Sequence, residues 1–235
     1  MNILCIVAHP DDTEILCAGT LIRYAQDGHR VTMAVFTDGS MGDTVIRPDK
    51  LKITREKETH DAAAVIGAKV ILGGITDEHV FPDAMQRRRM IDILRIADPD
   101  IIFTHSPNDY HPDHRYVSQL VFDAYFQKGL PHIPEQEIAA CRFGKAQVYY
   151  MDNLGGIGFI PTEYVNISDV FEIKKQMLAC HKSQFDAMQD LANTDLFDMI
   201  EVQARFRGMA AGCHYAEGFT RLDAFQRGLT NRILP

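Results

Sequence analysis

Two short polar segments carry the residues best suited to chemistry: His9-Pro10-Asp11-Asp12, and the stretch HSPNDYHPDH at 105–114. Each follows an apolar run of strand length. Their imidazoles and carboxylates belong to His9, His111, His114, Asp11, Asp12 and Asp113. Imidazole with carboxylate is a ligand set that zinc and related divalent ions bind, and a catalytic zinc keeps three protein ligands and one open position. The sequence therefore predicts a divalent metal site.

The spacing within each segment restricts which side chains can share one ion. His9 and Asp12 lie three residues apart at a predicted helix start, so both can face one side of the turn while Asp11 points elsewhere. His111 and His114 have the same separation, so one can ligate while the other faces the open side. Two simpler interpretations stay open: Asp12 as a helix N-cap, and His105 as a core histidine at a strand end.

Elements that can position these segments alternate along the first half of the chain. Strands are expected at 2–8, 30–36, 69–72 and 101–105, and helices at 13–26, 52–66, 84–97 and from Pro112 onward. Apolar strands alternating with helices predict an α/β fold, a Rossmann-like three-layer sandwich with a mainly parallel sheet. In such a sheet, ligands bind beyond the carboxyl ends of the strands at the switch point in strand order, where the two polar segments would meet.

The second half predicts a less regular α/β part. Strands are expected at 147–151 and 163–167, and helices at 169–181 and 196–212. No composition shift, internal repeat or low-complexity tract divides the chain. We therefore expect a single domain over residues 1–235.

Composition narrows the class of partner and the compartment. The chain has 24 basic and 32 acidic residues, a net charge of −8, which argues against nucleic acid or a membrane surface as partner. The basic run at 87–89 is interpreted as a solvated helix face or a subunit contact. Five dispersed cysteines without a CxxC pair indicate reduced thiols and a cytoplasmic location. No segment has the length and apolarity of a signal peptide or a membrane span.

At these residues the sequence resembles the PIG-L/LmbE-like family of zinc-dependent N-acetylglucosaminyl de-N-acetylases. AHPDDTE at 8–14 and YHPDHR at 110–115 match the two signatures of that family. Weaker likenesses are Arg55-x-x-Glu58 with the alanines and glycine that follow, HKSQ at 181–184, and YAEGF at 215–219. The resemblance covers nearly the whole chain.

The resemblance implies a role for each polar residue of the two signatures. The zinc ligands would be His9, Asp12 and His114, with iron(II) or another divalent metal as the alternative ion. Asp11 would be the general base, and His111 would stabilise the oxyanion or protonate the leaving amine. Asp113 would orient His111 and keep it cationic; its alternatives are a partner of a ligand histidine or a helix-start carboxylate.

Substrate contacts are implied for Arg55, Asp109 and Tyr215. Without the family, Arg55 is an exposed helix arginine, Asp109 a turn residue and Tyr215 a core residue. His181 and Gln184 are expected to tie a helix end to the site or to cap it. The Asn-Asp-Tyr before HPDH departs from the Gly-Gly or Tyr-Gly of several relatives, so the residues for acid catalysis and specificity stay open.

The predicted function is hydrolysis of an N-acetyl group on an N-acetylglucosamine-containing small molecule, giving acetate and an amine. One alternative is an amidase that acts on another acylated amino sugar or a thiol conjugate. The other is a non-catalytic α/β ligand-binding module, although the chain lacks GxGxxG and GxxxxGK[ST] phosphate loops. A homo-oligomer, trimer or hexamer, is implied by the resemblance alone.

Overall fold

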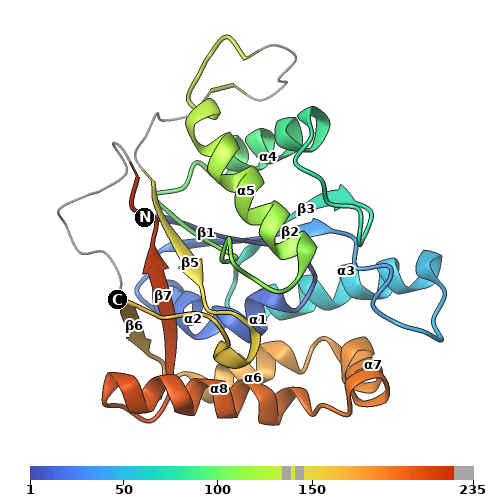
Figure 1. Ribbon diagram of the computed structural model, residues 1–235, viewed down its shortest axis with the longest axis vertical. Coiled ribbons are helices and arrows are strands. Elements are labelled where there is room, and N and C mark those ends of the chain that lie inside the picture. The colour runs from blue at the N-terminus through green and yellow to red at the C-terminus, as the bar shows by residue number, and fades with distance from the viewer. Residues whose placement is uncertain (134–138, 141–145, 225–235) are drawn as a thin grey trace.

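A mixed seven-stranded sheet forms the centre of the described structure (Figure 1). The computed structural model describes residues 1–133, 139–140 and 146–224. The strands are β1 Asn2–Val7, β2 Arg30–Thr37, β3 Lys69–Ile75, β4 Ile101–Thr104, β5 Gln147–Met151, β6 Glu163–Asn166 and β7 Ala216–Arg221. The helices are α1 Asp12–Leu16, α2 Ala18–Gln26, α3 Pro48–Val65, α4 Ala84–Ala97, α5 Pro112–Gln127, the 3-10 turn η1 Leu154–Gly156, α6 Phe171–Leu178, α7 Lys182–Ala192 and α8 Leu196–Ala211.

The strand order is β3-β2-β1-β4-β5-β7-β6. The first five strands are parallel, whereas β7 runs antiparallel to both β5 and β6. The predicted α/β fold with a mainly parallel sheet is therefore confirmed. The order reverses between β1 and β4, which places the segments after those two strands side by side at the switch point.

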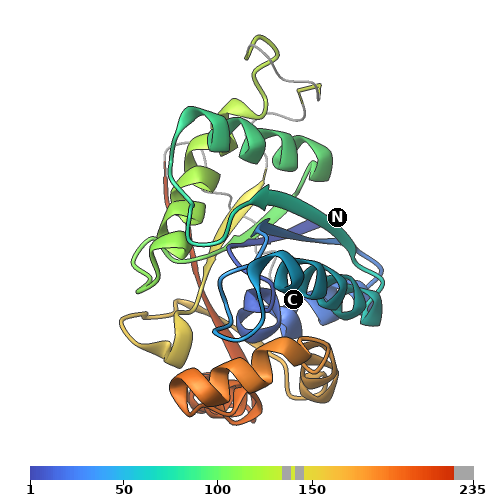
Figure 2. The same cartoon turned by 90° about the vertical axis from the view of Figure 1, so that its right-hand side faces the viewer.

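Strand β1 shows why this sequence forms a sheet covered on both faces. Ile3, Cys5 and Val7 enter one core cluster, and Leu4 and Ile6 enter the other. Successive strand residues point to opposite faces, and burial of each large apolar side chain contributes about 1.5–3 kcal/mol. Helices α4 and α5 cover one face, and α1, α2, α3 and α8 pack against the other, with α6 packed on α1, α2 and α3 (Figures 1 and 2).

The helix predicted at 13–26 is two helices, α1 and α2, because the chain breaks at Cys17 (φ −142°, ψ −7°). The cause lies far away in sequence. The Glu217 carboxylate on β7 accepts hydrogen bonds from the backbone N–H groups of Gly19 and Thr20 at 2.9 and 2.7 Å. It therefore caps a new helix start, where a carboxylate is favourable.

Other boundaries shift modestly. Strand β3 continues past the predicted end at residue 72 through a register shift opposite Val35 and Thr37. Gly73 permits this irregularity, since a Cβ there would lie 2.3 Å from the Phe36 carbonyl oxygen. The predicted helices at 52–66 and 169–181 are Pro48–Val65 and Phe171–Leu178. Helix α7 and strand β7 were not predicted, whereas α4 and β5 have the predicted bounds.

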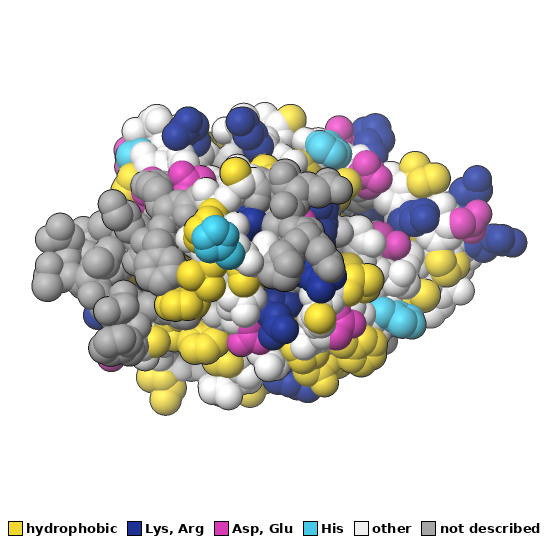
Figure 3. All heavy atoms as spheres, turned by 90° about the horizontal axis from the view of Figure 1, so that it is seen from above, with side chains coloured by type: hydrophobic (Ala, Val, Ile, Leu, Met, Phe, Trp, Pro, Cys, Tyr) yellow, Lys and Arg dark blue, Asp and Glu magenta, His cyan; other side chains and the backbone are white. Residues whose placement is uncertain are grey.

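The described helices include none that is both long and apolar enough to cross a bilayer. On the face seen in Figure 3, described Lys and Arg side chains lie among Asp, Glu and hydrophobic side chains instead of forming one broad basic patch.

One residue of the basic run at 87–89 contacts the sheet. Arg89 donates a hydrogen bond to the carbonyl of Gly73 at 2.9 Å, so it binds near the end of β3.

Candidate metal and catalytic site

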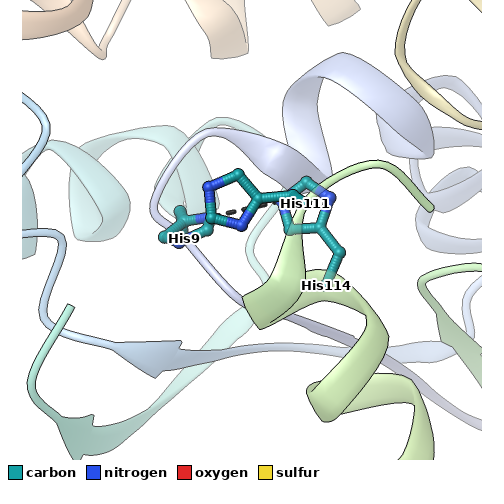
Figure 4. A group of neighbouring side chains, drawn as sticks. All are labelled: His9, His111 and His114. Atoms are coloured by element: carbon teal, nitrogen blue, oxygen red, sulfur yellow. Dashed lines mark hydrogen bonds between the residues drawn. The ribbon is translucent and has the colours of Figure 1, made fainter. Parts of the chain in front are cut away.

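The segments after β1 and β4 meet at the switch point. Figure 4 shows His9, from the turn after β1, beside His111 and His114 at the start of α5. The His9 Nδ1 and His114 Nε2 atoms are 3.2 Å apart. The two polar segments predicted to become neighbours are therefore in contact.

Three donor groups form a compact triangle. The Asp12 carboxylate has one oxygen 3.3 Å from His9 Nδ1 and the other 3.4 Å from His114 Nε2, and the two nitrogens are 3.2 Å apart. A tetrahedral ion with bonds of about 2.0–2.2 Å separates its ligand atoms by roughly 3.3–3.6 Å. The donor types and their spacing thus fit one zinc-like ion held by His9, Asp12 and His114.

Two neighbouring histidines already accept backbone hydrogen bonds. Among the described residues, three overlapping trios have ligand atoms close enough to hold an ion: His9, His111 and His114; Asp12, His105 and His114; and His9, Asp77 and Glu78. However, His105 Nε2 accepts the backbone N–H of Ala8 at 2.9 Å, and His111 Nδ1 accepts that of Asp113 at 3.2 Å. These nitrogens have no lone pair left for an ion, which favours the triangle.

His105 packs against His114, one of the three donor groups of the triangle. Its ring is fully buried and stacks on the His114 ring with centroids 3.8 Å apart and planes 9° apart. Burial, together with His114, lowers the pKa of His105 to about 4, so the ring stays neutral. This arrangement agrees with the interpretation of His105 as a core histidine.

Carboxylates stand behind both ligand histidines. Asp109 Oδ2 lies 3.2 Å from His114 Nδ1, and Asp77 Oδ1 lies 3.2 Å from His9 Nε2. Such partners fix the orientation of a ligand imidazole and raise its basicity. Asp109, predicted to contact substrate, is therefore placed behind His114, with only 4% of its surface exposed. Sequence reasoning missed Asp77, although the pair Asp77-Glu78 follows an apolar strand as HPDD does.

Asp113 occupies a different place from the one expected. Its Oδ2 accepts the backbone N–H of Glu78 at 3.0 Å and lies 3.5 Å from His9 Nε2. Only the backbone N–H of Asp113 contacts the His111 ring. The alternative role, a partner of a ligand histidine, fits this geometry better than the orientation of His111.

His111 is locked in one tautomer. Because Nδ1 accepts the Asp113 N–H, the proton of the neutral ring sits on Nε2. That atom lies 3.3 Å from a Glu78 carboxylate oxygen, and both residues line the cavity. Burial and the nearby His9 and His114 lower the pKa of His111, which opposes the cationic form expected from the sequence.

Asp11 lies outside the triangle but beside it. Its backbone is left-handed (φ 98°), a conformation that costs a non-glycine residue about 1–3 kcal/mol and recurs at functional sites. Its carboxylate lines the cavity and lies 3.3 Å from an Arg55 guanidinium nitrogen. Burial raises the pKa of Asp11 to about 6, against the opposing effect of Arg55.

Arg55 is a buried residue, 3% exposed, and not the surface arginine of the simpler interpretation. Its guanidinium donates to the carbonyl of Gly39 at 3.1 Å and to that of Pro10. Glu58, one turn along α3, accepts from the Ser183 backbone N–H and hydroxyl at 2.8 and 2.7 Å. The R-x-x-E motif therefore fixes both the HPDD turn and the start of α7.

A cavity of about 180 Å³ opens over the triangle. Its lining combines the polar cluster, Arg55 and Gln184 with several apolar side chains. Tyr215, predicted to contact substrate, does not line it. Its ring stacks on Phe171 at 3.9 Å and its hydroxyl donates to Glu201 at 3.0 Å. Tyr215 precedes β7, whose position it helps to fix, so the predicted pocket contact is not found.

Comparisons with known proteins address the family. The sequence model of the family PIG-L, described as GlcNAc-PI de-N-acetylase, matches residues 4–125. The chain is 29% identical to the diacetylchitobiose deacetylase of Thermococcus kodakarensis, over 92% of this chain and 81% of that protein. It is 28% identical to a probable N-acetyl-alpha-D-glucosaminyl L-malate deacetylase 2 of Bacillus cereus, over 80% of this chain and 85% of that one.

A solved structure extends the likeness to the fold. The N,N'-diacetylchitobiose deacetylase of Pyrococcus horikoshii superposes with a TM-score of 0.81 and 26% identity, covering 94% of this chain and 83% of that one. The likeness in structure thus continues well beyond residue 125.

Proposed function

The chain belongs to the PIG-L family of deacetylases, and from this premise we propose that it removes the acetyl group from an N-acetylglucosamine-containing small molecule with the help of a divalent metal ion. The observation that carries the proposal is the donor triangle of His9, Asp12 and His114 with a separate carboxylate, Asp11, beside it. The products would be acetate and a primary amine.

The metal would be held by the three groups of the triangle, with Asp109 behind His114 and Asp77 and Asp113 behind His9. When bound, such an ion lowers the pKa of a coordinated water to about 7 and polarises a carbonyl. The chemistry of two neutral imidazoles and one carboxylate suits zinc, and iron(II) is the alternative.

Asp11 is the proton carrier in this proposal. Its carboxylate is not one of the triangle's donors, so an oxygen remains free to accept a proton from the attacking water. The water oxygen bonds to the amide carbon, the C–N bond breaks, and the same carboxyl group returns the proton to the leaving nitrogen. Arg55 holds the Asp11 carboxylate in place through the 3.3 Å contact.

His111 is the donor to the amide oxygen. The sequence left two roles open for this residue, and its tautomer favours one. A neutral ring with its proton on Nε2 can hydrogen-bond the carbonyl oxygen as negative charge develops there. Protonation of the leaving amine would require a second ring proton on Nδ1, where the Asp113 N–H already points.

The test is acetate release from a panel of N-acetylglucosamine conjugates, with metal content measured on the same samples. We expect release that a chelator abolishes and that added zinc or iron(II) restores. Inertness across the panel with metal bound would overturn the sugar assignment. Absence of metal after gentle purification, together with inertness, would favour the non-catalytic binding module.

The metal's identity, the trimeric or hexameric assembly and the cytoplasmic location stay predictions. The amidase on another acylated amino sugar or thiol conjugate remains the alternative, and the same panel distinguishes it when those acylated amines are included.

A further inference from the structure

One part of the lining of the cavity that contains the metal triangle, called here the apolar wall, carries only apolar side chains. It is formed by Leu154 of η1, Met188 of α7, and Leu196 and Met199 of α8. All four come from the second half of the chain, whereas the triangle comes from the first; Gln184 of α7, one turn before Met188, is the one polar residue that the second half adds to the described lining. A sugar hydroxyl facing this wall would find no hydrogen-bond partner on these side chains.

The wall is the cavity-facing margin of a hydrophobic core. Leu196 is buried within that core, while Leu154, Met188 and Met199 pack against it and remain partly exposed. Their contacts with the core hold the side chains at the cavity. Methionine adapts its shape to irregular apolar partners, so two methionines can fit ligands of different outline.

Outside the metal triangle, the described lining of the cavity offers no free lysine or arginine to a ligand. Arg55 is the only lysine or arginine among the described lining residues, and it is occupied by Gly39, Pro10 and Asp11. Glu78 adds a half-exposed carboxylate, with 52% of its side chain accessible, near His111. Away from the metal ion, an anionic group on the substrate would therefore meet the Glu78 carboxylate without a free lysine or arginine to compensate it.

We propose that the substrate carries an uncharged, apolar aglycone beside the N-acetylglucosamine amide, and that this group packs on Leu154, Met188 and Met199. The inference rests on the proposed function and narrows its substrate class. It distinguishes this chain from an enzyme for carboxylate-bearing conjugates, because the apolar wall favours an alkyl or similar group and Glu78 disfavours an anion.

The test compares kcat/KM for acetate release along a series of alkyl N-acetylglucosaminides, from methyl to hexyl. Each methylene that becomes buried raises kcat/KM by up to about fourfold, so we expect a total gain of roughly 10- to 100-fold. The N-acetylglucosaminide of L-malate should be the poorest substrate of the panel.

Two variants assign the effect to the proposed residues. Met199→Gln should reduce the hexyl-to-methyl ratio severalfold, whereas Met209→Gln, the same change on an 80% exposed methionine of α8, should leave that ratio unchanged. Glu78→Gln should raise the malate-to-methyl ratio roughly two- to fivefold. Because each readout is a ratio between substrates, a general loss of activity does not move it.

The outcomes separate this inference from the proposed function. Hydrolysis of the panel with a flat alkyl series, or a gain that appears only when the N-acyl group is lengthened, would overturn the apolar aglycone. A hexyl-to-methyl ratio that Met199→Gln leaves intact would also overturn it. Inertness toward every member would instead contradict the deacetylase assignment itself.

Discussion

The two halves of the molecule contribute different things to the cavity. Residues 4–125, which the PIG-L family model matches, carry the triangle of His9, Asp12 and His114 and the neighbouring Asp11. The later residues carry the apolar wall. Turns directly after parallel strands hold the polar groups, so the sheet fixes their backbone. The wall lies on helices and a 3-10 turn at the margin, where sequence can vary without disturbing the metal site.

The halves are nevertheless joined by buried polar contacts. Glu217 on β7 accepts from the N–H groups of Gly19 and Thr20 and from Lys174 at 2.6 Å. Glu58 on α3 holds the start of α7 through Ser183. Through these contacts the second half of the chain also holds helices of the first half in position. Variants can distinguish residues that hold the structure from residues that take part in the reaction.

The largest effect is expected at Asp11. Asp11→Asn should lower turnover roughly 100- to 10,000-fold while metal content stays unchanged, because the amide cannot take a proton and the triangle is untouched. Acetate release and metal content on one sample measure this. Asp12→Ala, at the next residue, is the matched control and should lose metal and turnover together. Full activity in Asp11→Asn would refute the assignment of the base.

The next largest effect concerns the join between the halves. Glu217→Ala should lower the free energy of unfolding by about 3–5 kcal/mol, because it leaves Lys174, 2% exposed, as an unpaired buried charge. Denaturant unfolding of the metal-free protein measures the change. Asp61→Ala, which removes an exposed ion pair with Lys57, is the control and should leave the free energy of unfolding nearly unchanged, because solvent screens that pair. An equal cost for both variants would contradict the anchoring role of Glu217.

A smaller effect is expected from the carboxylates that contact the ligand histidines, and it concerns the affinity for metal. Asp109→Asn should weaken metal binding roughly 10- to 100-fold, because Asp109 is the carboxylate that faces the far nitrogen of His114. Competition with a chelator of known affinity measures it. Asp113→Asn should weaken binding less, since His9 keeps Asp77 at 3.2 Å. If Asp113→Asn had the larger effect, the pairing of carboxylates with histidines described above would be wrong.

Much of the fold followed from local pattern. The continuous apolar run of β1 and the Pro112 start of α5 are short-range signals, and both elements appear where these residues predict them. The break at Cys17 was missed because its cause, the Glu217 carboxylate, lies about 200 residues away. Strand β7 was missed because YAEGF was interpreted as a family segment, with Tyr215 as a pocket contact or a core residue, and not as a strand.

The residues of the site also fall into two groups, those that local sequence predicts and those that depend on tertiary contacts. The segments HPDD and HPDH contain metal-ligand residue types separated by three positions, so a cluster able to bind a metal could be predicted from the sequence. The place of Asp77 and Glu78 in the site could not be predicted. It depends on β3 lying two strands from β1, with its carboxyl end at the same edge of the sheet. The burial of Arg55 was equally hidden, since the carbonyls that it binds belong to other segments.

The sequence by itself determined which atoms can bind a metal and at which strand ends they sit, because residue type and spacing along one turn are local properties. Only the tertiary structure decided which carboxylate lies next to which histidine, which tautomer His111 adopts, and that four apolar side chains line the same cavity as the triangle. Those are relations between segments far apart in the chain, and their geometry is set by how the sheet and helices pack.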